Sequence, residues 1–342
     1  MQKIKVENAV GKILAHDLTK IVPGKFKGAA FKKGHIIKAE DIPELKEMGK
    51  EHIYTYKMSP GDLHEDDAAK RLADILQGEN LEAVGPEEGK ITLKSGCKGL
   101  LKVDKEALLC MNFHPEIIVS TLHNNRPVQK EDKVAATRVI PLVIDEDKIS
   151  EVEERLETGP PLVNVKAYQK SGAGLIVTGN EIYYGRVQDK FKPVINSKMT
   201  AYGMTLKETA YLPDDKKQLS SKLIEMVNRE DLELVVISGG MSVDPDDITP
   251  DVIREAGAEV VTYGTPVLPG AMLMLAYWHQ KPIIGLPACA MFAETTAFDL
   301  LLPRIAAGEM VTRDDIARLG HGGLCLQCET CRFPNCSFGK ES

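Results

Sequence analysis

With 342 residues the chain is longer than one usual domain, so two or three domains are expected, each able to bury its own core. Its 43% hydrophobic and 27% charged residues are typical of a soluble globular protein, and a net charge of −7 gives no support for nucleic-acid binding. Apolar runs such as VIPLVI and AMLMLAY are too short to span a membrane. The start MQKIKVENAVGKILAHDL carries charges where a signal peptide needs an apolar core, which predicts a cytoplasmic protein.

Residues 1–57 are expected to form a β-rich segment, because short apolar pairs alternate there with Gly and Pro. One short helix is expected over residues 41–48, ended by Gly49. The pattern then changes, and residues 58–162 are expected to form a small α+β domain with a linker helix at its end. In HEDDAAKRLADILQG one helical face is apolar and the first turn is acidic, as the helix dipole favours. Strand-like pieces follow in KITLKSG, GLLKVD, IIVSTLH and KVAATRVIPLVI, and then a charged helix in DEDKISEVEERLETG.

Strands and helices alternate over residues 163–310, which predicts an α/β domain with a mostly parallel sheet covered on both faces. Strands are expected in NVKAYQ, GLIVTG, LKETAYL, LELVVIS, AEVVTYG, MLMLAYW and PIIGLP. Helices are expected over about 192–202, in DDKKQLSSKLIEMVNRE, in PDVIREAG and over about 290–305. Ligands of such sheets bind at the carboxyl ends of the strands, where the loops TGNEIYYG, SGGMSVDPDD and GLPACA are found.

The most informative stretch of this domain is VVISGGMSVDPDDITP. A β-branched run, typical of a strand buried on both faces, ends at Gly239 and Gly240, where the backbone can turn sharply and approach a ligand. Three acids follow, and Thr249 is expected to cap a helix that has Pro250 at its first position. Free N–H groups would favour an anion and the carboxylates a divalent cation. The alternative is an ordinary loop with solvated aspartates.

The segments VTGNEI, VVISGGMSVDPDDITPDVIREAGAEV, PVLPGAM and IIGLPACA resemble the molybdopterin molybdenumtransferase family in their order and spacing. That family has a TGDE loop, an SGG-x-S-x-G-x-x-D motif, KPGKP and GLPGNP. The resemblance covers about residues 165–308, and GKFKGAAFKKGHIIKAEDIPELKEMGKEHIYTY looks more loosely like the family's β-rich companion segment. It implies a domain that binds molybdopterin or its adenylated form and inserts molybdate with the help of Mg²⁺.

The resemblance also implies roles for single residues. Asp247, with Asp246 beside it, would be catalytic, and Asp247 would also be a ligand of Mg²⁺. The residues implied to bind the pterin cofactor are the three loops and the PVLPG segment, namely Thr178, Gly179, Asn180, Glu181, Ser238, Gly239, Gly240, Ser242, Pro269, Gly270 and Pro287.

The sequence departs from the family at several of these positions. Asn180 stands where the TGDE motif has its aspartate, and Asp244 replaces a glycine of the SGG motif. The stretch LPGAM contains neither lysine of KPGKP, and GLPACA replaces GLPGNP. An inserted stretch, YYGRVQDKFKPVIN, supplies Arg186, Lys190 and Lys192 as other cations. Binding of a pterin phosphate is therefore better supported than a conventional transferase reaction.

The last segment, residues 311–342, contains four of the seven cysteines: Cys325, Cys328, Cys331 and Cys336. Two, two and four residues separate them, and a reducing compartment argues against disulfides. An iron–sulfur cluster fits the three tightly spaced cysteines, and Zn²⁺ fits four thiolates; free thiols are the remaining alternative.

Two functions of different classes are consistent with these features. The first is an enzyme of molybdenum cofactor biosynthesis that acts on molybdopterin or its nucleotide form with molybdate and Mg²⁺. The second is a non-catalytic carrier or sensor of the finished cofactor, whose cysteine tail reports redox state or docks on a molybdoenzyme. A related nucleotide-pyrophosphate hydrolase is a third hypothesis, and a homo-oligomer is compatible with each of them.

Overall fold

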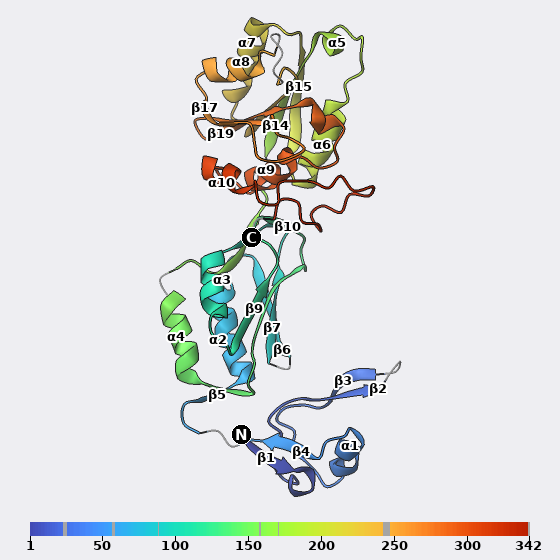
Figure 1. Ribbon diagram of the computed structural model, residues 1–342, viewed down its shortest axis with the longest axis vertical. Coiled ribbons are helices and arrows are strands. Elements are labelled where there is room, and N and C mark those ends of the chain that lie inside the picture. The colour runs from blue at the N-terminus through green and yellow to red at the C-terminus, as the bar shows by residue number, and fades with distance from the viewer. Residues whose placement is uncertain are drawn as a thin grey trace. The chain divides into compact units, whose positions relative to one another are not determined.

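The computed structural model describes residues 1–22, 26–56, 59–87, 89–156, 159–169, 171–241 and 247–340 (Figure 1). The chain divides into two compact units, and each unit contains segments that are far apart in the sequence. The first comprises Met1–Gly96, Val103–Leu122 and Glu131–Asn164; the second comprises Cys97–Lys102, His123–Lys130 and Val165–Ser342. The domain boundaries expected near residues 57, 162 and 310 stay predictions.

The first part of unit one is β-rich, as expected. Strand β1 (Gln2–Lys5) pairs antiparallel with β4 (His52–Thr55), and β2 (Leu18–Val22) pairs antiparallel with β3 (Phe26–Phe31). In the sequence, the short 3₁₀ helix η1 (Val6–Asn8) follows β1, and α1 (Asp41–Glu47) lies between β3 and β4. Leu14, Ile37 and Leu45 are fully buried in a small core of their own.

The rest of unit one is the expected α+β arrangement. Its antiparallel sheet has the order β6-β7-β11-β9, and β5 pairs with β12. Helix α2 buries Ala68, Leu72 and Leu76, the face that the sequence periodicity predicted. The element bounds are β5 (Asp62–His64), α2 (Glu65–Leu76), β6 (Leu81–Glu87), β7 (Lys90–Ser95), α3 (Lys105–Asn112), β9 (Ile117–Thr121), β11 (Lys133–Val139), β12 (Val143–Asp145) and α4 (Glu146–Leu156). Helix α3 was not expected; the Asp104 carboxylate caps it by accepting from the N–H groups of Glu106 and Ala107.

One predicted strand lies in a different sheet from the one expected. The stretch NVKAYQ overlaps β13 (Val163–Ala167). This strand joins β8 (Gly99–Val103) and β10 (Arg126–Val128) in the order β10-β8-β13, apart from the large sheet. Its assignment to the parallel sheet was wrong. A Cβ atom at Gly99 would overlap the carbonyl oxygen of Lys166, so glycine is what allows β8 and β13 to approach each other so closely.

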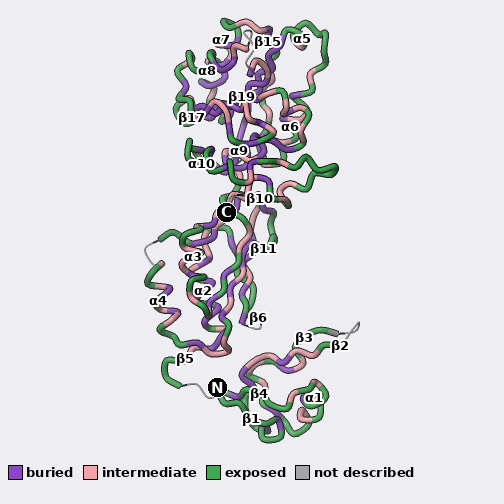
Figure 2. The backbone as a smooth tube through the Cα atoms, in the orientation of Figure 1, coloured by how far each residue is buried: buried purple, intermediate pink, exposed green. Residues whose placement is uncertain are grey.

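The large sheet of unit two confirms the expected α/β fold. Its order is β15-β14-β16-β19-β18-β17, where β15, β14, β16 and β19 run parallel, and β18 is antiparallel to both β19 and β17. The strand bounds are β14 (Gly172–Thr178), β15 (Thr205–Leu212), β16 (Leu234–Ser238), β17 (Glu259–Tyr263), β18 (Met274–Trp278) and β19 (Lys281–Leu286). Every residue of β14 and β16 is buried, as Figure 2 shows for the centre of this sheet.

Helices cover both faces of this sheet (Figure 1). Leu175 and Val236 pack in one core with residues of α6 and α9, whereas Ile176 and Val235 pack in a second core with residues of α7 and α8. This explains why the strands read as continuous apolar runs rather than alternating ones. The remaining element bounds are α5 (Asn180–Tyr183), α6 (Phe191–Ala201), α7 (Lys216–Val227), α8 (Thr249–Glu255), η2 (Ala288–Met291), α9 (Ala297–Ala306) and α10 (Arg313–Arg318).

Two helix starts differ from expectation. The helix expected over 290–305 is the 3₁₀ helix η2 followed by α9, because Thr296 and Asp299 form a capping box that begins a new helix. Thr249 does not cap α8: the N-cap is Ile248, and the buried Thr249 hydroxyl donates a 2.9 Å hydrogen bond to the carbonyl of Gly239.

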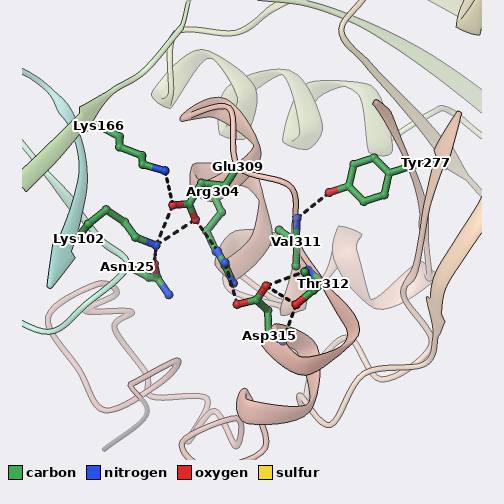
Figure 3. A network of polar contacts seen from close by, with 9 residues as sticks. All are labelled: Lys102, Asn125, Lys166, Tyr277, Arg304, Glu309, Val311, Thr312 and Asp315. Carbon is green, nitrogen blue, oxygen red and sulfur yellow. Dashed lines mark hydrogen bonds and ion pairs between the residues drawn. The ribbon is translucent and has the colours of Figure 1, made fainter. Parts of the chain in front are cut away.

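The segment after α9 belongs to the same core. Val311, Ile316, Leu319 and Phe338 are buried against the α6–α9 face of the sheet. A polar network around Glu309 ties this segment to β8 and β13 (Figure 3). Across the part of the chain that the structure describes, no helix combines the length and the apolar character needed to cross a membrane.

Candidate functional site

The predicted ligand-binding loops meet at one edge of the large sheet. Strand register pairs Val177 with Ser238 and Ser238 with Leu286, so the loops that follow β14, β16 and β19 leave the sheet side by side. Strand β18 runs in the opposite direction and pairs Met274 with Gly285, so the Pro269–Gly270 segment before it reaches the same edge. The sheet topology thus brings together the loops that contain Asn180, Gly240, Gly270 and Pro287.

The turn after β16 depends on its glycines for packing within the protein. Gly239 has φ +99° and Gly240 has φ +58°, and both are half-buried. A Cβ atom at Gly239 would overlap the carbonyl oxygen of Thr178, and one at Gly240 would lie 2.9 Å from the Thr249 hydroxyl. The glycines therefore allow β14, β16 and α8 to approach closely, and the turn leaves its backbone partly accessible.

Ser238, which precedes the two glycines, differs from them in its accessibility. The Ser238 side chain is fully buried, and its hydroxyl has no hydrogen-bond partner among the residues that the structure describes. It lies beneath the surface in this conformation, so the backbone of the two glycines is the accessible part of the turn. Ser242, Asp244 and Asp246 lie outside the described residues.

The loop after β14 is fixed by a carboxylate that the sequence analysis did not single out. Asp214, which follows β15, accepts hydrogen bonds from the Thr178 hydroxyl at 2.9 Å and from the Asn180 N–H at 3.0 Å. Asp214 therefore places a negative charge beside Asn180, the position where the resembling family has an aspartate. The sequence could have indicated this carboxylate, because Asp214 and Asp215 come one residue after LKETAYL and the end of that strand lies at the same edge.

Beyond this carboxylate, the Asn180 and Glu181 side chains are exposed at the edge. Gly179 has φ +147°, and the Glu181 carboxylate folds back toward it. A Cβ atom at Gly179 would lie only 2.7 Å from Glu181 Oε1. The cations of the inserted stretch, Arg186, Lys190 and Lys192, are exposed, and the Arg186 guanidinium lies 5.4 Å from the centre of the Tyr184 ring.

The PVLPG and GLPACA loops contact each other. The Thr265 hydroxyl donates to the Gly270 carbonyl at 3.1 Å, and Gly270 (φ +116°) packs so closely on Ala297 that a Cβ would lie 2.6 Å from its nitrogen. Burial raises the pKa of the Cys289 thiol, and a hydrogen bond from the Gly270 backbone opposes part of this rise. Pro287 is half-buried and Ala288 is exposed, so the second loop presents its first turn to solvent.

Asp247 is the acidic residue of the SGG motif that the structure describes. It is half-buried, and its charge adds to the effect of burial in raising the pKa of Tyr263, whose hydroxyl donates to the Met241 carbonyl at 3.3 Å. A carboxylate at the start of α8, next to a glycine turn, fits the oxygen ligands that Mg²⁺ prefers. In the arrangement of the described residues, no group of three or more His, Cys, Asp or Glu side chains is placed so that it could hold a metal ion.

The four cysteines of the last segment lie together, although they are not part of the edge just described. Cys325, Cys328, Cys331 and Cys336 all line one cavity of about 200 Å³. Cys325 and Cys336 are half-buried against the main core, whereas Cys328 and Cys331 are exposed.

Two families match separate parts of the chain. Residues 174–307 match a family described as a probable molybdopterin binding domain, and residues 3–57 match a domain of unknown function, DUF8806. The first match contains all of the loops at the sheet edge.

Curated relatives match a shorter stretch. A CinA-like protein of Mycobacterium marinum is 34% identical over 90 residues, which are 26% of this chain and 21% of that protein. Protein PAE0875 of Pyrobaculum aerophilum is 32% identical over 80 residues, which are 23% of this chain and 29% of that protein. The matched stretch thus spans less than a third of either relative.

Similar solved structures include two of archaeal and bacterial origin. The molybdopterin biosynthesis enzyme MoaB of Thermus thermophilus aligns with 18% identity and a TM-score of 0.34, covering 41% of this chain and 98% of that chain. The protein CinA of Thermoplasma acidophilum aligns with 18% identity and a TM-score of 0.32, covering 36% and 91%.

Proposed function

We propose that unit two binds molybdopterin or its nucleotide form at the edge formed by the loops after β14, β16 and β19, and that the protein acts in molybdenum cofactor biosynthesis. The observation that carries this proposal is that the stretch matching the molybdopterin-binding family contains every loop that strand register brings to that edge. Fold and site therefore support the same ligand class.

The accessible groups at the edge suit such a ligand. The exposed Asn180 amide can both donate and accept hydrogen bonds, as a pterin ring requires. The partly accessible backbone of Gly239 and Gly240 offers N–H donors for a phosphate. Arg186, Lys190 and Lys192 are exposed after the first loop and supply positive charge that the PVLPG loop lacks.

A steric block at the edge tests the binding proposal. Ala288 is exposed in the second loop, so Ala288→Tyr should keep the fold and place a ring over the site. We expect the protein purified from a cofactor-producing cell to retain molybdopterin, and the variant to retain at least about tenfold less, a loss of about 1.4 kcal/mol or more in binding. Mass spectrometry of the released ligand gives the readout.

The matched control is Ala201→Tyr. Ala201 is exposed at the end of α6, directly before β15 begins, and therefore lies at the opposite edge of the sheet. It should retain as much pterin as the unmodified protein. Equal retention in both variants, at an amount similar to the unmodified protein, would show that the edge is not the binding site.

We further propose that the bound pterin receives molybdate with the help of Mg²⁺ at Asp247. When bound, Mg²⁺ would neutralise charge on phosphate and molybdate oxygens. Asp247→Asn keeps the shape and removes the charge, so we expect metal-dependent turnover to fall at least about tenfold while pterin retention changes little. The control is Asp251→Asn, an exposed acid of α8 that pairs with Arg254. Turnover that is equal with and without Mg²⁺ would contradict the metal role.

The alternative is a non-catalytic carrier of the cofactor that delivers it to a molybdoenzyme. The observation that favours it is the LPGAM stretch, in which Leu268 and Ala271 stand where a phosphate-binding loop of the resembling family has its two lysines. Pterin retention together with no molybdate-dependent turnover, even in the unmodified protein, would support the carrier. The same assay therefore separates the two functions.

A further inference from the structure

The segment that contains the four cysteines is a closed loop anchored to unit two. The N–H of Gly339 donates to the carbonyl of Gly322 at 2.9 Å, which joins the two ends of the loop. Phe338 is almost completely buried in the main core, and the Phe333 ring packs edge-on against it with 6.2 Å between the ring centres. The cysteines are thus held on an ordered loop by contacts outside the cysteines themselves.

This loop also makes strand-like contacts with the PVLPG segment. The Leu268 N–H donates to the Gly323 carbonyl, and the Cys325 N–H donates to the Leu268 carbonyl, both at 2.8 Å. These hydrogen bonds therefore hold the backbone of Cys325 against Leu268, the residue that precedes Pro269. The cavity is also lined by Phe292 and Thr295, which follow the GLPACA loop.

The cavity that the four cysteines line also contains aromatic rings. Its volume is about 200 Å³, and the rings of Phe292, Phe333 and Phe338 line it together with the four thiols. A structural zinc ion bonds four thiolates at about 2.3 Å, which draws all four sulfur atoms into contact around it. An iron–sulfur cluster instead distributes the four thiolates over several iron atoms and fills the space between them with sulfide.

The groups around the sulfur atoms suit a cluster as well. The Thr295 hydroxyl lies 3.2 Å from Cys331 Sγ, and the Gln327 N–H donates to Cys325 Sγ at 3.5 Å. Hydrogen bonds to cysteine sulfur, together with an apolar surround, are the means by which proteins hold and tune such clusters.

We propose that Cys325, Cys328, Cys331 and Cys336 bind one [4Fe–4S] cluster in this cavity. The two-residue spacings of the first three cysteines are those of bacterial cluster-binding runs, and Cys336 reaches the cavity because the loop closes at Gly322 and Gly339. The cluster would lie next to two loops of the proposed pterin site, yet its binding does not depend on pterin.

The test is anaerobic purification of the full chain followed by analysis of iron, acid-labile sulfide and zinc. We expect about four iron atoms and about four sulfides per chain, with a broad visible absorbance that bleaches on reduction. One zinc atom per chain without iron would overturn the proposal, and so would iron and zinc that are both far below one atom per chain.

Serine variants show which thiols are ligands. Cys328 and Cys331 are exposed, so Cys328→Ser and Cys331→Ser should fold normally and still lose most of the iron, at least about fivefold. The control is Cys97→Ser, because Cys97 does not line the cavity, and it should keep the full iron content. Full iron content in both exposed-cysteine variants would contradict the assignment.

Thr295→Val tests the hydrogen bond from Thr295 to Cys331 through the midpoint potential of the cluster, which a purely structural role of Thr295 would not change. Val keeps the shape of the buried Thr295 but cannot donate to Cys331 Sγ, so the cluster should remain bound with a lower midpoint potential. Thr295→Ser restores the hydroxyl and should restore the potential. An unchanged potential in Thr295→Val, with the cluster in place, would exclude the hydrogen bond to a cluster ligand.

Discussion

Gly239 shows how a single missing side chain can hold the candidate site together. Its φ of +99° is unfavourable for any other residue, and its hydrogen atom faces the carbonyl oxygen of Thr178 on the neighbouring strand. A backbone carbonyl in the centre of a parallel sheet cannot move aside as the end of a flexible side chain can. The glycine is therefore required by the fold before any ligand is considered.

We expect Gly239→Ala to destabilise unit two by about 3 kcal/mol, of which about 1–2 kcal/mol is backbone strain and the rest the overlap with Thr178. Gly203→Ala is the matched control: Gly203 has φ +79°, but a Cβ there would meet no atom within 4 Å, so it should cost only the strain. Denaturant unfolding followed by the fluorescence of Trp278, the one tryptophan of the chain, reports on this unit. Equal costs for both variants would mean that the Thr178 carbonyl imposes no constraint.

At the scale of elements, a buried carboxylate joins segments from three parts of the chain (Figure 3). Glu309 follows α9 and forms ion pairs with Lys102 of β8 at 2.8 Å, Lys166 of β13 at 3.0 Å and Arg304 of α9 at 2.9 Å. Arg304 also pairs with Asp315 of α10 at 2.9 Å. The small three-stranded sheet is thereby tied to the helices that end unit two.

The same contacts set the protonation of Glu309. Burial by itself would raise the pKa of this carboxyl group, but the hydrogen bonds and charges of Lys102, Arg304 and Lys166 lower it to about 2. In the unfolded chain the pKa returns to about 4.3, so the ionised form is stabilised by folding. The stabilisation is complete above about pH 4.3 and is lost as the pH falls toward 2.

We therefore expect Glu309→Gln to lower the free energy of unfolding by about 3 kcal/mol at pH 7, because it leaves the buried Arg304 and the half-buried Lys102 without their shared carboxylate. The difference from the unmodified protein should shrink as the pH falls below about 4.3. Trp278 fluorescence during denaturant unfolding at several pH values measures both effects. Glu259→Gln, an exposed position on β17, is the control and should change stability by less than about 0.5 kcal/mol. A difference that is independent of pH would contradict the low pKa.

At the scale of the whole molecule, the chain forms two units that each combine distant segments. Unit two takes residues 97–102 and 123–130 from the middle of the chain and adds them to everything after residue 164. The segment after α9 contributes Ile316, Leu319 and Phe338 to the core of this unit. The cysteine loop is thus built onto the α/β fold of unit two.

Much of this architecture was predictable because its signals are local. The continuous apolar runs of β14 and β16 predicted strands buried on both faces, and the glycines after them predicted sharp turns at one edge. The resemblance to a molybdopterin-binding family rests on the same loops, and the match of residues 174–307 supports it. The approximate bounds of α6 were likewise predicted, and helical periodicity predicted the apolar face of α2.

Other features depended on contacts between residues far apart in the sequence. Examples are the pairing of β13 with β8, the hydrogen bonds of Asp214 with Thr178 and Asn180, and the cavity that Cys336 and Cys325 both line. All three follow from the path of the chain between the partners. A local pattern records which face of an element is apolar, but not which partner covers that face. The sequence by itself therefore determined most of the elements and the family that unit two resembles. The tertiary structure decided which strands pair, which carboxylate fixes the first loop and which thiols line one cavity, because these depend on packing between distant segments.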